Sequence, residues 1–238
     1  ILAVWYILSK RKTTTCRDNI RKEILDIAIP IWGLSVITSA IAVADTSLLR
    51  WGLIRSGLTE TEARYLYGAY SGYAMTVLNL PVGLLATLGV SVVPIVSGAV
   101  AVGNMLRVRS ITRKGMILSF FGGICATLGL AFFGEFMLKL LFNNTASAKM
   151  LLLATPSVLF ICLMQFSGAV LQAMGKMGYV FVSAVTAGII KLLSEILLAS
   201  RPELNIYGAV VSNIACYSIA AIINLYYVKK HIEGRCSF

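Results

Sequence analysis

The chain has 238 residues, of which 58% are hydrophobic and only 13% charged, and its mean hydropathy is +0.84. Soluble domains carry about 25% charged residues, so the composition excludes a soluble globular protein and predicts an all-α protein that crosses a membrane several times. The formal net charge of +11 is spread between apolar runs. A nucleic-acid-binding domain gathers its charge on one folded face, so we expect no nucleic-acid partner and attribute the charge to membrane topology.

The cysteines and the histidine of this chain do not follow a pattern typical of a metal site. The five cysteines show no CxxC spacing, and three of them lie inside apolar runs, where a thiol behaves as a small hydrophobic group. They are Cys16, Cys125, Cys162, Cys216 and Cys236, and the one histidine is His231. We therefore expect no catalytic residues, no bound metal and no cofactor. The chain also lacks a Walker motif, so no ATP site is expected.

The first 23 residues divide into an apolar and a basic part. Residues 1–9 are apolar but too few to span a bilayer, and we interpret them as the cut end of a preceding transmembrane helix. Residues 10–23 form a basic linker, which the positive-inside rule assigns to the cytoplasm. Residues 24–230 are expected to form a lobe of six transmembrane helices, and residues 231–238 a cytoplasmic tail.

The first expected span covers residues 24–49 and carries an acidic residue, Asp45, on its polar stripe. Asp45 could be a helix-end carboxylate that reaches the outer interface, or it could bind a cation or proton, or pair with an arginine. Residues 50–66 form an extracytoplasmic connector. Its Arg50 and Arg55 are either solvated or contact a pyrophosphate, and the hydroxyls and carboxylates of the stretch Thr59-Glu60-Thr61-Glu62 are expected to cap the next helix.

The second expected span, residues 69–104, contains no charged residue and organises the lobe. At about 100° per residue, its polar and small side chains share one sector of the helix. Two prolines, Pro81 and Pro94, each remove a backbone donor, which membrane helices tolerate where a neighbour or a wet cavity satisfies the freed carbonyls. We therefore predict a bent helix with hinges at the two prolines. Its polar sector is expected to line a cavity, and the candidate residues are Thr76, Asn79, Gly83, Thr87 and Ser91.

Four more spans are expected over residues 115–142, 149–174, 179–199 and 206–228. The fifth span contains the intramembrane charges Lys191 and Glu195, spaced i, i+4, which we interpret as a pair that neutralises itself, with a role in the cavity as the alternative. The amides of Gln165, Gln172, Asn213 and Asn224 are expected to make hydrogen bonds between helices. The inner loops hold more than twice as many basic residues as the outer ones, which puts both ends of the lobe inside.

The second span also carries a family resemblance. The segment NLPVGLLATLGVSVVP, preceded by LYGAYSG and followed by AVGN, resembles the stage V sporulation protein B group of lipid-linked precursor flippases. This group shares a superfamily with MurJ-type lipid II flippases and MATE exporters. The resemblance rests on the spacing of Asn79, Pro81, Gly89, Ser91 and Pro94. One position departs from it, because Gly98 stands where the family often carries an acid.

The resemblance implies a MATE/MOP-type transporter in which two six-helix lobes flank a central cavity, with this chain as the second lobe and the first lobe missing. Its expected partners are membrane lipid and a lipid-linked oligosaccharide or peptidoglycan precursor, moved across the bacterial cytoplasmic membrane by alternating access. A MATE-type drug/cation antiporter is the nearest alternative. A membrane enzyme acting on lipid-linked saccharides is less favoured, because Glu60 and Glu62 in a short turn make a poor acid pair. A structural membrane subunit is a third alternative.

Overall fold

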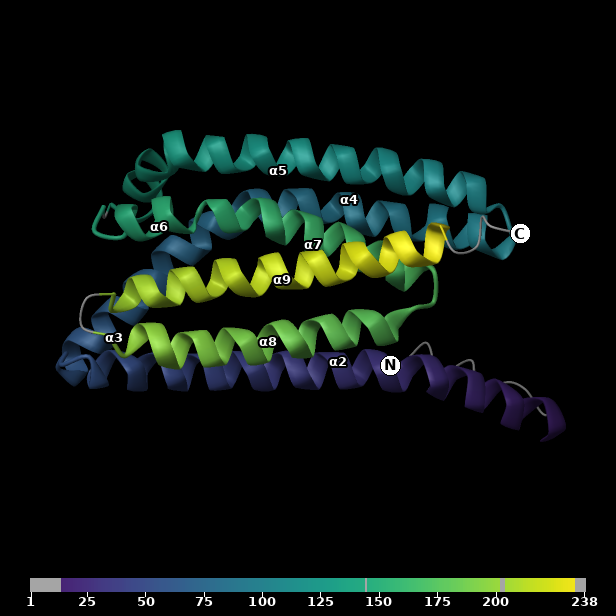
Figure 1. Cartoon of the computed structure of the whole chain (residues 1–238), viewed down its shortest axis with the longest axis horizontal. Coiled ribbons are helices and arrows are strands. Elements are labelled where there is room, and N and C mark those ends of the chain that lie inside the picture. The colour runs from purple at the N-terminus through teal and green to yellow at the C-terminus, as the bar shows by residue number, and fades with distance from the viewer. Residues whose placement is uncertain (1–13, 144, 202–203, 234–238) are drawn as a thin grey trace.

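The computed structural model describes residues 14–143, 145–201 and 204–233, and for residues 14–31, 34 and 233 it describes the backbone alone. Every regular element in these ranges is helical (Figure 1). The elements are α2 (Thr14–Arg55), α3 (Glu60–Gly68), the π-helix η1 (Ala69–Ala74), α4 (Met75–Ala101), α5 (Met105–Phe142), α6 (Ala148–Ala154), α7 (Pro156–Ala173), α8 (Met177–Ala199) and α9 (Ile206–Glu233).

Six stretches of the described helices are long and apolar enough to cross a membrane. This confirms the predicted all-α fold with six transmembrane spans. The stretches are Ser35–Arg55, Glu60–Ala101, Met105–Phe142, Pro156–Ala173, Met177–Ala199 and Ile206–Ile232. The protein is therefore a multi-pass membrane protein.

The first span differs from its predicted bounds at both ends. Helix α2 begins at Thr14, so the described part of the basic segment 10–23 is helical and not a loop. It continues to Arg55, so the connector to α3 contains only residues 56–59. The residues predicted as a cut helix end, 1–9, and most of the predicted tail, 234–238, lie outside the described residues.

The start of α3 follows the predicted capping pattern. Glu62 N donates to Thr59 Oγ1, and Thr59 N donates to the Glu62 carboxylate at 2.9 Å. This reciprocal pair satisfies amides that the first helical turn leaves free. The chain then runs diagonally through α3 and η1 before α4 turns parallel to the other long helices (Figure 1).

The predicted span over residues 149–174 is divided in two. Helix α6 ends at Ala154, and α7 begins at Pro156. Proline has no amide hydrogen to continue the hydrogen-bond ladder of the preceding turn, but it fits the first turn of a new helix. Pro156 is therefore the feature of the sequence that indicates this break.

Helix α9 lies in the middle of the lobe. It packs against α8 on one side and α7 on the other; α2 covers α8, while α4 and α5 cover α7. Figure 1 shows the same order, with the α2–α8 pair on one side of α9 and α4, α5 and α7 on the other. Helices α2 and α4 are thus on opposite sides of the lobe's middle layer.

Two glycines allow α2 and α8 to approach closely. A Cβ atom at Gly188 on α8 would lie 2.4 Å from Ile41 Cδ1, and one at Gly52 on α2 would lie 3.1 Å from the Ala199 Cβ. The two helices run in parallel, so these contacts repeat along their length (Figure 1). Ile41 and Gly188 each precede an ionisable residue, Asp45 and Lys191, by one helical turn.

The core is largest toward the end of the lobe where α2 passes into α3. A cluster of buried side chains from α2, η1, α4, α6, α7 and α9 fills this half. The other half has two small clusters, around Phe166 and around Val96. The lobe is therefore closely packed at one end and open at the other.

Candidate functional site

An ion pair inside the lobe joins α2 to α8. Lys191 Nζ lies 2.6 Å from Asp45 Oδ1, and the two side chains are only 14% and 23% exposed. Because charges are costly to hold in an apolar layer, such groups are expected to pair and often mark a functional site. The close packing at Gly188 positions the two helices for this contact.

This contact corrects the predicted partner of Lys191. The i, i+4 spacing favoured Glu195, yet the direct ion pair is with Asp45 on another helix. Glu195 is 1% exposed, its Oε2 atom has no hydrogen-bond partner, and it interacts electrostatically with both Asp45 and Lys191. We call these three residues the charge cluster.

The position of Asp45 also bears on its predicted roles. If the span ended near residue 49, Asp45 could reach the outer interface from the helix end. Helix α2 instead continues to Arg55, which leaves about 15 Å of helix beyond Asp45. The carboxylate has a basic partner, Lys191 rather than an arginine, and its role at the interface or with a cation or proton stays a prediction.

Polar residues of η1 and α9 surround the charge cluster. Asn213 Nδ2 donates a hydrogen bond to Tyr70 Oη, and Tyr217 interacts electrostatically with Lys191. Tyr70 also interacts with Asp45 and Glu195. Single π-helical turns occur often at functional sites, and here η1 carries Tyr70. The ion pair joins α2 to α8, and the Asn213–Tyr70 hydrogen bond joins α9 to η1. We call these polar groups the interior network.

The charge cluster has an excess of acid. If all three groups are ionised, two carboxylates oppose one ammonium, and one negative charge is left without compensation in an apolar layer. Such a site favours the uptake of a proton or of a cation. Among the described residues, no group of three or more His, Cys, Asp or Glu residues is arranged to hold a metal ion.

A cleft of about 500 Å³ lies between α2 and α4, toward the open half of the lobe. Its floor comes from α7, α8 and α9. Gly89 of α4 faces it, packed so that an added Cβ would lie 3.3 Å from the Ala169 Cβ. The residues that line the cleft carry hydroxyls and amides but no charge: Ser35, Thr38, Gln165, Gln172, Ser183 and Asn224, together with small and apolar residues.

Two amides in this cleft have oxygens without a partner. Gln165 Oε1 and Asn224 Oδ1 are both buried and accept no hydrogen bond. Asn224 Nδ2 on α9 donates to the Met164 carbonyl on α7 at 3.4 Å. Asn213, also on α9, donates to Tyr70 on η1. The predicted hydrogen bonds between helices are thus confirmed for Asn213 and Asn224, and the remaining acceptors are available to a ligand or to water.

The polar stripe of α4 lies beside this cleft and does not line it. All five of its predicted cavity residues are exposed: Thr76, Asn79, Gly83, Thr87 and Ser91. A Cβ at Gly83 would meet nothing within 4 Å. The cleft is lined by the adjacent sector of α4, which contains Ala86, Gly89, Val90 and Val93. The predicted face is exposed, but none of its five residues lines the cleft between α2 and α4.

The two prolines lie inside a continuous α4, at positions 81 and 94. The break in regular α-helix precedes them, at η1. Their role as hinges concerns a motion and stays a prediction.

The two arginines of the predicted connector, Arg50 and Arg55, have partners at the protein surface. Arg50 lies 3.8 Å from Glu60, which also binds Arg64 at 2.6 Å. The Arg55 guanidinium lies 5.0 Å from the centre of the Trp51 ring. Both arginines are near the α2–α3 connector, away from the cleft, and their contact with a pyrophosphate stays a prediction.

Sequence reasoning missed Tyr70. Tyr70 lies in the second expected span, residues 69–104, but a tyrosine near the end of an apolar run is typical of an anchor at the membrane interface. The signal that was available is the hydroxyl itself, because a buried tyrosine needs a hydrogen-bond partner.

Comparison with known proteins gives three distant relatives, all from Bacillus subtilis (strain 168). The chain is 23% identical to stage V sporulation protein B over 211 residues, 25% identical to sporulation protein YkvU over 193, and 26% identical to the membrane protein YabM, described as uncharacterized, over 239. These alignments cover 87%, 81% and 97% of this chain, but it spans only 40%, 43% and 44% of the relatives. No family model matches the chain, and no solved structure matches it.

Proposed function

We propose that this chain forms one lobe of a MATE/MOP-type flippase that moves a lipid-linked saccharide precursor across the bacterial cytoplasmic membrane. The observation that supports this proposal best is the polar face of α4. In a membrane-spanning lobe, a helix face in contact with lipid is expected to be apolar, yet five polar or small residues of α4 are exposed together. Such a face suits another protein surface or a water-filled cavity.

A second lobe facing α4 would give this stripe a partner. In transporters built from two repeats, the substrate site lies between them near the middle of the bilayer, and one repeat rocks against the other. In this arrangement the cleft between α2 and α4 opens toward the opposite lobe. Small residues such as Gly83 and Ser91 would let that lobe, or a headgroup, approach the backbone closely.

The chemistry of the cleft favours a saccharide over an organic cation. Its polar groups are hydroxyls and amides, including the free acceptors on Gln165 and Asn224. Sugar hydroxyls pair with such groups in both directions, as donors and as acceptors. A MATE-type antiporter of cationic drugs would instead need an acidic lining, and none of the residues that line this cleft is acidic.

Transport, rather than catalysis, is the activity that we infer. The charge cluster supplies a group that responds to protons or cations, and through it an ion gradient or the membrane potential could drive the movement. The lipid tail of the substrate would stay in the bilayer while its headgroup crosses along the face of α4.

The test uses the protein expressed from its complete reading frame and reconstituted in proteoliposomes with a fluorescent lipid-linked saccharide. Gly83→Leu and Ser91→Leu place bulk on the exposed polar face, and we expect each to reduce flipping at least tenfold at unchanged protein abundance. Leu84→Ile is the matched control. Leu84 is 75% exposed beside the stripe, and this change conserves volume, so flipping should persist.

Two results would contradict the proposal. Equal loss in Gly83→Leu and Leu84→Ile would mean that the polar face has no special role. Flipping that proceeds at the rate of protein-free liposomes, in a wild-type preparation shown to be folded, would exclude the activity for this substrate class.

A further inference from the structure

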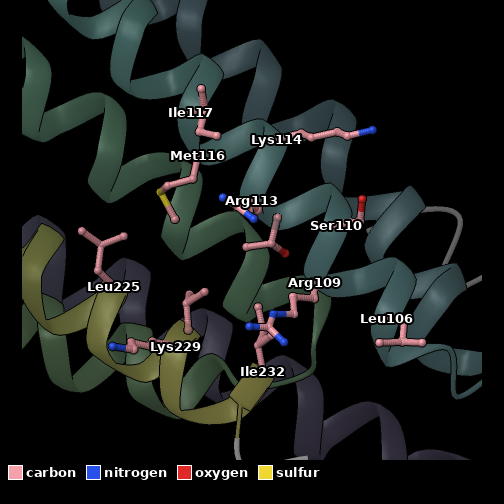
Figure 2. A pocket seen from close by; sticks show the side chains of 12 residues that line it. Leu106, Arg109, Ser110, Arg113, Lys114, Met116, Ile117, Leu225, Lys229 and Ile232 are labelled. Atoms are coloured by element: carbon pink, nitrogen blue, oxygen red, sulfur yellow. The ribbon is translucent and has the colours of Figure 1, made fainter. Parts of the chain in front are cut away.

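A second hollow, lined by other residues than the cleft, lies at the ends of α5 and α9 where the basic loops gather. It is a groove of about 900 Å³ between the first turns of α5 and the last turns of α9. Figure 2 shows the two helices on either side of it, with Leu225, Lys229 and Ile232 on α9.

Four basic residues line this groove: Arg109, Arg113 and Lys114 from α5, and Lys229 from α9. Arg109 and Arg113 are one helical turn apart, both are exposed, and in Figure 2 both side chains extend toward the space between the helices. No carboxylate pairs with either arginine among the side chains that the structure describes. Guanidinium groups bind phosphate oxygens in a bidentate manner.

A hydroxyl without a partner lies between these arginines in the sequence and lines the same groove. Thr112 is 4% exposed, and its Oγ1 atom makes no hydrogen bond. Several other buried hydroxyls donate to a carbonyl of their own helix, as Ser167, Ser183 and Ser212 do. Thr112 therefore leaves a donor and two acceptor sites for a ligand.

The groove changes from basic to apolar along its length. One turn further into α5 from Arg113 are Met116 and Ile117, and Leu225 faces them from α9. Helix α5 has 38 residues, or about 57 Å, whereas the hydrocarbon layer needs only about 30 Å. The first turns of α5 therefore extend into the headgroup region, with the apolar part of the groove beneath it.

We propose that this groove binds an anionic phospholipid of the inner leaflet. The headgroup phosphate contacts Arg109 and Arg113, and one acyl chain lies along Met116, Ile117 and Leu225. Basic pockets between transmembrane helices on the cytoplasmic side suit such headgroups. The complementarity of charge, and the order of basic and apolar residues along the membrane normal, support a lipid as the occupant. This inference is independent of the transported substrate.

The experiment measures lipid retention by native mass spectrometry on the purified protein, with phosphatidylglycerol and phosphatidylcholine as probes. The wild type should retain phosphatidylglycerol in preference to phosphatidylcholine. Arg109→Gln with Arg113→Gln should weaken retention of phosphatidylglycerol by roughly thirtyfold, because each positive charge lost weakens it by about fivefold. Thr112→Val, which keeps the side-chain shape, should weaken it by a smaller factor.

The matched control removes the same charge from the same end of the lobe. Arg107→Gln with Lys230→Gln alters α5 and α9 at residues that do not line the groove, and it should retain phosphatidylglycerol like the wild type. Size-exclusion profiles verify that all variants fold. Equal loss in the two double variants would mean that the lipid is held only by general surface charge, which overturns the site. Equal retention of the two lipids by the wild type also overturns it and favours a polypeptide segment as the occupant.

Discussion

The polar residues inside the lobe and those on the face of α4 differ in where their hydrogen-bond and ion-pair partners lie. Asp45, Lys191, Tyr70 and Asn213 reach across helices and pair with one another in the interior. On α4, Thr76, Thr87 and Ser91 donate only to backbone carbonyls three or four residues earlier in the chain, and their side chains remain exposed. Polar groups of the first kind fix how helices pack. Those of the second kind leave a surface for another molecule.

The largest effect is expected at Lys191. Replacing it by methionine leaves the Asp45 and Glu195 carboxylates without a counter-charge, and breaking a buried pair in this way costs about 3–5 kcal/mol. We expect a severe loss of folded, monodisperse protein and a lower unfolding temperature in detergent.

Double variants of Lys191→Met identify its partner. Adding Asp45→Asn should recover much of the folded yield, whereas adding Glu195→Gln should recover less, because the direct contact is with Asp45. A better recovery with Glu195→Gln would restore the intrahelical pairing and refute the link between α2 and α8.

The next effect concerns the packing that brings the charges together. Gly188→Val would drive side-chain atoms into Ile41, and overpacking of this kind costs about 1–3 kcal/mol. Unfolding temperature is again the measurement. Gly178→Val, on the same helix, is the control, because a Cβ there meets nothing within 4 Å. Equal destabilisation by both variants would mean that helix propensity, not contact with α2, sets the cost.

A smaller effect is expected from the uncharged part of the interior network. Tyr70→Phe removes the hydroxyl that accepts from Asn213, and leaving a buried amide unpaired costs about 1–3 kcal/mol. Tyr65→Phe, at a residue 60% exposed on α3, should be neutral. A neutral result for Tyr70→Phe as well would place Tyr70 outside the network that stabilises the lobe.

The smallest effect on stability is expected on α4. Asn79→Leu alters an exposed side chain and should change stability by less than about 0.5 kcal/mol. Its neighbour Leu78 is 1% exposed, and Leu78→Ala should cost about 2–5 kcal/mol. If Asn79→Leu destabilises the isolated lobe as strongly, the polar face of α4 is part of the packing, and the distinction from the interior network fails.

Much of the fold followed from local patterns. Apolar length and the absence of charge predicted the six spans, because a bilayer requires about 20 apolar residues for each crossing. The helix cap at the start of α3 could be predicted from residues 59–62 alone, since both of its hydrogen bonds lie within one helical turn. The exposure of Asn79 and Gly83 followed from helical periodicity, which assigns residues to a common face.

The pairing inside the lobe was decided by tertiary structure alone. Helical spacing gave Lys191 a neighbour four residues away, but its contact, Asp45, lies on a helix far away in the sequence and is brought close where α8 packs on α2 at Gly188. The same limit hid Tyr70 and its partner Asn213, and the groove between α5 and α9. Periodicity assigns a side chain to one face of its helix, but only the packing of helices determines which residue lies opposite that face.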